Sequence, residues 1–386
     1  MTFRGADLDA ILCFSHLRWD FVFQRPQQVL SRAARQHRVF YIEEPRQLDV
    51  QEAALKVRLS DEGVHVVSPH LPLAQHEGFA ARSVRSLVDE LVGRYNIRDH
   101  VQWYYTPMAL PASRHLNRAC VVYDCMDELA LFKNAPAELS ALESELFRHA
   151  SVVFTGGHSL FEHKRLRHHN VHVFPSAVDA AHFAHTTASE DPADQRSLRR
   201  PRIGFYGVLD ERFDPQLLAG AAQMRPDWQF ILIGPVVKIE PSGLPRAANI
   251  HYLGQRPYAS LPAYLHHWDI AFLPFARNEA TRFISPTKTL EYLAAGKPVI
   301  STSVQDVVEP YGQRGWVAIA DDAASFIRAA DTILAGRSPK GRPGDIERFI
   351  ADMSWDSTWS RMQDLITSAR GHARCAPRRH DVSVAV

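Results

Sequence analysis

The residues with the clearest chemical meaning lie in one stretch, NEATRFISPTKTLEYLAAGKPV, residues 278–299. A helix is predicted to begin near Thr287, and the backbone N–H groups at a helix start bind anions. Ser285 or Thr287 can cap this helix with a side-chain oxygen. Lys288 places a cation in the first turn, where it is unfavourable unless an anion lies nearby, and Glu291 follows one turn later. A nucleotide diphosphate with its ribose would satisfy this arrangement. The alternative is an ordinary capped helix with a Lys288–Glu291 surface pair.

Two further cations follow the ends of predicted strands in the same half of the chain. Arg212 comes soon after strand 202–206, and Lys238 comes soon after strand 229–233. Both could bind a diphosphate, because ligands of parallel α/β sheets lie beyond the carboxyl ends of the strands. Alternatively, Arg212 pairs with a nearby aspartate and Lys238 is solvated. Gly207, at the end of the first of these strands, is explained by backbone shape, with close approach to a ligand as a second role.

Polar side chains also follow predicted strands in the first half. His16 belongs to the cluster SHLRWD, residues 15–20, which is costly to bury in a packed core and is expected to face a cleft. Asp124, Asp127 and Glu128 follow another strand and could be a base, a metal site or acceptors for sugar hydroxyl groups. We expect sugar or structural contacts from these acids.

A dense basic run, HKRLRHH, occupies residues 163–169 at the end of a predicted helix. One interpretation is peripheral contact with an anionic membrane. The alternative is a solvated helix end whose cations favour the helix dipole.

Short apolar strands alternate with helices along the whole chain, which predicts βαβ units and parallel sheets. The expected strands of the first half are 10–14, 38–42, 101–105, 120–124, 152–155 and 171–174, with extended pieces at 56–59 and 64–67. The expected strands of the second half are 202–206, 229–233, 250–253, 270–273, 298–301 and 316–319. Amphipathic helices are expected between them, including 80–95, 137–149, 287–295 and 323–334.

The alternation breaks once, in the polar segment 185–200, which has no apolar period and is typical of a linker. The prediction is therefore an α/β protein with two doubly wound, Rossmann-like domains, 1–190 and 191–354, that face each other across a cleft. A helix over 355–370 is expected to return to the first domain, and 371–386 to be a disordered tail.

The composition of the 386 residues excludes several classes of protein. The 44 Lys and Arg nearly balance the 43 Asp and Glu, which argues against a basic nucleic-acid binder. The four cysteines show no zinc-knuckle spacing, and we expect no disulfide scaffold or metal site. No apolar run of about 18 residues occurs, so the expected compartment is the cytoplasm, with the inner face of the membrane as a peripheral location.

SPTKTLEYLAAGKPV (285–299) resembles the donor-site helix of GT-B glycosyltransferases of the retaining family-4 kind. The resemblance covers nearly the whole chain and extends to FSHLRWDFVFQRPQQ (14–28), VYDCMDE (122–128), FTGGHSL (154–160) and IGFYGVLDER (203–212). These motifs resemble a bacterial subgroup that assembles exopolysaccharide or cell-wall polysaccharide. The resemblance implies the GT-B fold, with an acceptor-binding first domain and a donor-binding second domain.

By this resemblance, Glu291 matches the second Glu of the E-x7-E motif and binds the donor ribose. Phe283 stands where the first Glu is expected, and Glu279 is the nearest acid that could reach the donor sugar. The lysine usual after the first strand of the second domain is also missing, so Lys288 could supply that charge. The nucleotide base of the donor is expected near the loop GQRPY, residues 254–258.

The resemblance implies transfer of a sugar from a nucleotide-diphosphate sugar to a saccharide or lipid-linked acceptor, with retention. The leaving diphosphate would help to deprotonate the acceptor, and the protein would position the substrates and stabilise charge. His16 or Asp124 would orient the acceptor. No cofactor, metal or nucleic-acid partner is implied. Two alternatives stay open because this sequence lacks the first Glu of the motif and the usual lysine. They are a GT-B-fold sugar-nucleotide epimerase and a noncatalytic sugar-nucleotide-binding protein.

Overall fold

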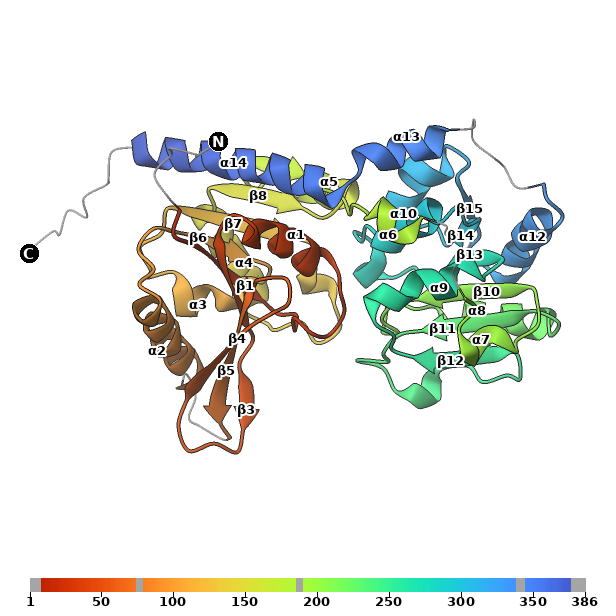
Figure 1. The fold of residues 1–386 in the computed structure, drawn as a ribbon, viewed down its shortest axis with the longest axis horizontal. Coiled ribbons are helices and arrows are strands. Elements are labelled where there is room, and N and C mark those ends of the chain that lie inside the picture. The colour runs from red at the N-terminus through yellow and green to blue at the C-terminus, as the bar shows by residue number, and fades with distance from the viewer. Residues whose placement is uncertain (1–7, 74–78, 185–189, 338–343, 376–386) are drawn as a thin grey trace, which may run out of the picture.

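The computed structural model describes residues 8–73, 79–184, 190–337 and 344–375. They form two α/β domains that lie side by side, and the last helix leaves the second domain and runs along one edge of the first (Figure 1). The short apolar strands explain the architecture, because strands buried on both faces must be covered by helices on each side.

Nine described strands form the sheet of the first domain, in the order β3-β5-β2-β1-β6-β7-β8-β9, and β4 pairs antiparallel with β5. The strands are β1 Ala10–Ser15, β2 Arg38–Glu43, β3 Arg46–Leu48, β4 Ala54–Leu59, β5 His65–Pro72, β6 His100–Tyr104, β7 Cys120–Cys125, β8 Val152–Thr155 and β9 Val171–Val173. The helices are α1 Arg25–Ala34, α2 Phe79–Arg94, α3 Leu110–Ser113, α4 Leu139–His149 and α5 His158–Lys164, with 3-10 turns η1 Pro107–Ala109 and η2 Leu129–Leu131. Separate apolar clusters cover the two faces of this sheet.

The described part of the second domain has a six-stranded parallel sheet in the order β12-β11-β10-β13-β14-β15. Its strands are β10 Arg202–Tyr206, β11 Gln229–Ile233, β12 Ile250–Gly254, β13 Ile270–Leu273, β14 Val299–Ser301 and β15 Val317–Ile319. Its longer helices are α8 Pro215–Met224, α9 Leu261–His266, α10 Thr287–Ala294, α12 Ala323–Leu334 and α13 Asp345–Asp352. Shorter pieces are α6 Ala180–Phe183, α7 Ala193–Arg196, η3 Pro241–Gly243, η4 Tyr258–Ser260, η5 Glu279–Thr281, α11 Gln305–Val307 and the π-turn η6 Val308–Gly312.

The segment predicted as a linker is structured where it is described. Residues 185–189 lie outside the described residues, but α7 packs on the second domain. Gln195 is fully buried, and its side-chain oxygen accepts a hydrogen bond from Trp268 Nε1 at 3.1 Å. Asp191 pairs with Arg202 at 2.7 Å. The polar composition of the segment does not reveal these contacts, because the partners Trp268 and Arg202 lie outside it. The segment therefore resembles a linker in the sequence alone.

The last helix, α14 Trp355–Cys375, is longer than predicted. It packs against α1, and its Trp359 and Met362 belong to an apolar cluster of the first domain. The predicted disordered tail at 371–386 is therefore wrong for residues 371–375, which continue the helix, while 376–386 lie outside the described residues.

Candidate functional site

A cavity of about 990 Å³ lies between the two domains and is lined by both. The first domain contributes the segments after β1 and β7, and the second contributes the segments after β10 and β11 and the start of α10. Because these are the carboxyl ends of parallel strands, the cavity is at the position where such folds bind ligands.

The start of α10 supplies an acid and a cation to the cavity. Glu291 is 6% exposed, and its carboxylate accepts a hydrogen bond from the Tyr206 hydroxyl at 2.8 Å. Burial raises the pKa of Glu291, while the nearby Lys288 and the Tyr206 bond oppose that rise. Burial also lowers the pKa of Lys288, and Glu291 opposes that change. Glu291 is buried and Lys288 is partly buried, so the two opposite charges face the cavity rather than forming the solvated surface pair considered as an alternative.

Glycines make room for Lys288. Gly207 has φ +148°, and a Cβ atom there would lie 2.3 Å from Lys288 Cε. A Cβ atom on Gly234 would lie 1.8 Å from the Gly207 carbonyl oxygen. The two loops can pack beneath the lysine only because neither residue carries a side chain. The second role expected for Gly207 is close approach to a ligand, and the structure places Lys288 there.

Ser285 and Thr287 line the cavity but do not cap α10 as predicted. Pro286 is the N-cap residue, and no side chain caps the helix. Instead, Thr287 Oγ1 donates to Ser176 Oγ at 2.9 Å, and Ser176 Oγ donates to the Ser285 carbonyl oxygen at 3.0 Å. The prediction missed this arrangement because Ser176 belongs to the segment after β9, more than a hundred residues earlier.

Arg212 and Lys238 both line the cavity. Arg212 pairs with Asp210 through Nη2 at 2.6 Å, as the alternative interpretation expected. The ring of Phe132, in the first domain, contacts both cations, with its centroid 5.5 Å from Arg212 Cζ and 5.3 Å from Lys238 Nζ. Such contacts are cation–π interactions, so the first domain reaches across the cleft to the cationic side of the cavity.

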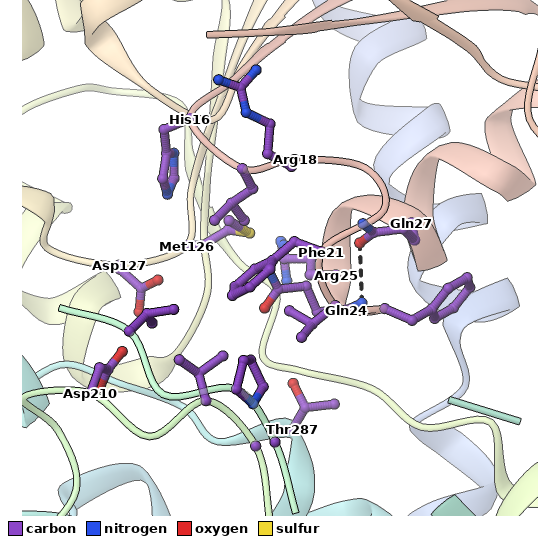
Figure 2. A pocket seen from close by; sticks show the side chains of 18 of the residues that line it. His16, Arg18, Phe21, Gln24, Arg25, Gln27, Met126, Asp127, Asp210 and Thr287 are labelled. Carbon is purple, nitrogen blue, oxygen red and sulfur yellow. Dashed lines mark hydrogen bonds between the residues drawn. The ribbon is translucent and has the colours of Figure 1, made fainter. Parts of the chain in front are cut away.

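His16 and Asp127 face these groups from the first domain. Figure 2 shows Asp127 and Asp210 on opposite walls of the pocket, with His16 beyond Asp127. Burial and the charge of Lys238 lower the pKa of His16 to about 4, and its buried Nδ1 has no hydrogen-bond partner among the described residues. Burial raises the pKa of Asp127, with Arg212 opposing and Asp210 reinforcing the rise. The site therefore contains a neutral imidazole and a carboxylate with a raised proton affinity.

Comparison with known proteins agrees with this geometry. Residues 200–336 match the sequence model of the family described as glycosyl transferases group 1. Sucrose-phosphate synthase from Thermosynechococcus elongatus superposes with a TM-score of 0.68 at 15% identity, covering 94% of this chain and 100% of that one. The chain has the GT-B fold. The Anabaena protein HepE, solved in complex with UDP-glucose, has a TM-score of 0.65 at 14% identity, with coverage of 93% and 99%.

This GT-B chain is also 25% identical over 210 residues to a putative teichuronic acid biosynthesis glycosyltransferase, TuaH, of Bacillus subtilis (strain 168). The match covers 53% of this chain and about half, 52%, of that protein. The resemblance stated from the sequence is thus confirmed at this level: residues 200–336 match the glycosyl transferases group 1 model, and the chain has the GT-B fold.

Asp124 and Glu279 do not occupy the positions expected of them in this GT-B cleft. Asp124 is fully buried in β7, does not line the cavity, and is neutralised by Arg25 through Nη2 at 2.8 Å. Glu279 has a 67% exposed side chain, lies outside the cavity lining, and is 3.5 Å from Arg282. Phe283, which stands in place of the family's first Glu, stacks on His163 of the first domain at 4.7 Å. Of the three acids Asp124, Asp127 and Glu128, Asp127 is the one that lines the cavity.

The loop at residues 254–258, expected near the base, is occupied by contacts within the protein. Arg256 pairs with Asp194 at 2.6 Å. Tyr258 stacks on His182 at 4.4 Å and on Phe23 of the first domain at 4.8 Å. Arg256 is thus held within the second domain, and Tyr258 packs on the first domain through Phe23, so both side chains are engaged within the protein in this arrangement.

Much of the charge in the basic run at the end of α5 is compensated. Lys164 is 1% exposed and pairs with Glu128 at 2.6 Å and with Glu143 at 2.8 Å. Arg167 also pairs with Glu143, and Arg165 pairs with Glu162. No helix among the described residues is both long enough and apolar enough to cross a membrane. The described residues also contain no group of three or more His, Cys, Asp or Glu side chains arranged to hold a metal ion.

Proposed function

We propose that this GT-B chain transfers a sugar from a nucleotide-diphosphate sugar to a saccharide or lipid-linked acceptor in the assembly of a bacterial polysaccharide. The observation that carries the proposal is the cavity itself. It brings the start of α10, with Lys288 and buried Glu291, opposite His16 and Asp127 of the other domain. One wall suits an anionic donor, and the other offers groups that can hold a hydroxyl.

The donor is placed by charge and hydrogen bonding. The diphosphate would lie at the uncapped start of α10, where backbone N–H groups and Lys288 favour an anion. Glu291 would accept hydrogen bonds from the ribose hydroxyls. Arg212 and Lys238 would neutralise the phosphate of the donor that lies farther from α10. Because both cations contact the Phe132 ring, the donor would have to bind beside Phe132 or displace it. Similar glycosyltransferases usually carry a lysine after the first strand of the second domain. Lys288 is our main candidate for the positive charge that this lysine would supply.

The acceptor would bind against the first domain. His16 is neutral above its lowered pKa of about 4, so it can accept or donate a hydrogen bond without adding a positive charge. Asp127 can accept a hydrogen bond from a sugar hydroxyl. We propose retention of configuration, with the leaving diphosphate taking the acceptor proton and the protein stabilising the departing charge. Transfer without a metal ion is likewise part of the proposal.

Uridine diphosphate sugars are the first donors to test. HepE, which shares the fold, was solved with UDP, with UDP-glucose and with UDP and glucose. The name of the Bacillus relative refers to teichuronic acid biosynthesis, which supports a polysaccharide product.

The experiment is incubation with UDP-, GDP- and TDP-sugars, with and without candidate acceptors, followed by quantification of nucleotide and sugar products. Nucleotide release that depends on the acceptor supports transfer. Conversion of the free sugar nucleotide into an isomer would establish an epimerase instead. Binding without turnover across the panel would favour a noncatalytic sugar-nucleotide-binding protein.

A further inference from the structure

A carboxylate of the second domain caps a helix of the first. Asp306, on α11, accepts hydrogen bonds from the backbone N–H groups of His158 and Ser159 at the start of α5, both at 2.9 Å. Each carboxylate oxygen takes one of the two bonds, and Asp306 is 5% exposed. Charge-assisted bonds of this kind are about twice as strong as neutral ones, and here they join the two domains.

The first domain is shaped to admit this carboxylate. Gly157 precedes α5, and a Cβ atom there would lie 2.0 Å from Asp306 Oδ2. The backbone of Gly157 is extended, with φ −167°, so conformation alone does not require glycine at this position. Space for Asp306 therefore explains the glycine, and the motif TGGHS is built around a contact between domains.

The same short helix reaches the loop that precedes the donor helix. The Cβ position of Gly157 is 2.8 Å from Ser285 Cβ, so the start of α5 touches this loop. His163, near the other end of α5, stacks on Phe283 at 4.7 Å. Ser176 adds a hydrogen bond to the Ser285 carbonyl oxygen. The loop 283–287 is thus held by the first domain at both of its ends.

We propose that Asp306 is a positioning residue that clamps α5 to the second domain and thereby fixes loop 283–287 in the conformation that receives the donor diphosphate. This role rests on the proposed function only for the identity of the ligand. The same role explains why Phe283 stands where the resemblance places an acid. In this chain the loop is held by α5 of the opposite domain, and Phe283 makes one of the contacts with α5.

Two substitutions approach the clamp from opposite sides. Asp306→Asn keeps the shape of the side chain but loses its charge and turns one acceptor into a donor that faces a backbone N–H. Gly157→Ala places a methyl group where the carboxylate lies, on the other domain. Asp322→Asn is the matched control, because Asp322 caps α12 within the second domain through Ser325 N at 2.7 Å.

The first measurement is hydrogen–deuterium exchange of the ligand-free protein, read in peptides that contain His158 and Ser159 and in peptides that contain residues 283–288. Asp306→Asn and Gly157→Ala should each accelerate exchange in both peptides by about tenfold, the factor that corresponds to loss of one charged hydrogen bond. The double variant should add little, because both changes break the same contact. The control should leave both peptides unchanged.

The second measurement is the affinity for UDP, GDP and TDP by calorimetry. Either single variant should bind the nucleotide that the wild type binds with about tenfold lower affinity, while the control should keep the wild-type affinity. Unchanged exchange in 283–288, or unchanged affinity despite faster exchange, would overturn the positioning role. If the wild type binds none of the three nucleotides, the proposed function fails, and the exchange data still decide whether the clamp orders the loop.

Discussion

The chemistry of the site depends on a few side chains held where burial changes their proton affinity. Glu291 and Lys288 are each shifted by burial towards the neutral form and held towards the charged form by the other. A bound diphosphate would add negative charge beside Lys288 and favour its protonated form. The sequence was enough to place both residues beside a possible anion at the start of one helix, because they lie within one turn of each other. It could not distinguish Asp124 from Asp127, because Arg25, the partner that neutralises Asp124, lies 99 residues away.

Gly207→Ala tests whether the position of Lys288 matters at the residue scale. The new Cβ would lie 2.3 Å from Lys288 Cε at a φ of +148°, so both the lysine and the loop must move. We expect affinity for the donor nucleotide to fall about tenfold or more, measured by calorimetry, with a stability cost of about 1–3 kcal/mol from backbone strain. Gly243→Ala is the control, since its Cβ would meet nothing within 4 Å. Equal affinity in both variants would show that Lys288 does not contact the donor.

At the scale of elements, the apolar strands explain why so much of the fold could be predicted. β8, β10, β11 and β13 begin and end where the apolar pattern predicts. β3, with the residues RQL, was missed because an exposed edge strand need not carry an apolar pattern. The structured part of segment 190–200 was missed for a related reason. Its buried polar residues are satisfied by partners in other elements, which composition does not reveal.

His100, at the start of β6, makes the stability of the first sheet depend on pH. Burial lowers the pKa of this 2% exposed side chain to about 4, with Arg118 assisting and Asp99 and Asp9 opposing. Because the folded pKa lies below the ordinary 6.5, the neutral form supports the fold above about pH 6.5. Stability is lost as the pH falls from there towards 4, by on the order of 2–3 kcal/mol.

Urea denaturation at pH 7 and pH 4.5 measures this effect. His100→Phe should be less acid-sensitive than the wild type, since it removes the group that must remain neutral. The same substitution at exposed His169 should leave the difference between the two pH values unchanged. An unaltered acid sensitivity in His100→Phe would mean that other groups cause the acid response.

At the scale of the whole molecule, the two domains are joined by contacts on several sides of the cleft. Asp306 caps α5, Tyr258 stacks on Phe23, and the Phe132 ring contacts both Arg212 and Lys238. The cleft itself was predictable, because two doubly wound halves must place their strand ends towards a shared ligand. The individual contacts were not, because each pairs residues that are remote in the sequence and belong to different domains.

The returning helix α14 makes the stability of the first domain depend on the far end of the chain. Trp359 is 6% exposed in a cluster of the first domain, with its ring 6.4 Å from that of Trp103. Trp359→Ala should cost about 3–5 kcal/mol through the cavity that it leaves. Hydrogen–deuterium exchange should then rise in β1, β6 and β7 and stay unchanged in β10 and β11.

Trp316→Ala is the complementary variant, because Trp316 lies in the core of the second domain. It should produce the reverse pattern of exchange. If Trp359→Ala accelerated exchange mainly in the second domain, α14 would stabilise the donor side rather than the first domain.

The central claim is that the start of α10 holds the nucleotide diphosphate of the donor, with Glu291 on its ribose. The most direct test is a calorimetric titration of UDP, GDP and TDP into the wild type and into the Glu291→Ala variant. We predict that the wild type binds at least one nucleotide and that the variant binds it about 10- to 100-fold more weakly, since hydrogen bonds to a charged group contribute roughly 1.5–3 kcal/mol. Near-normal affinity in Glu291→Ala would contradict the account.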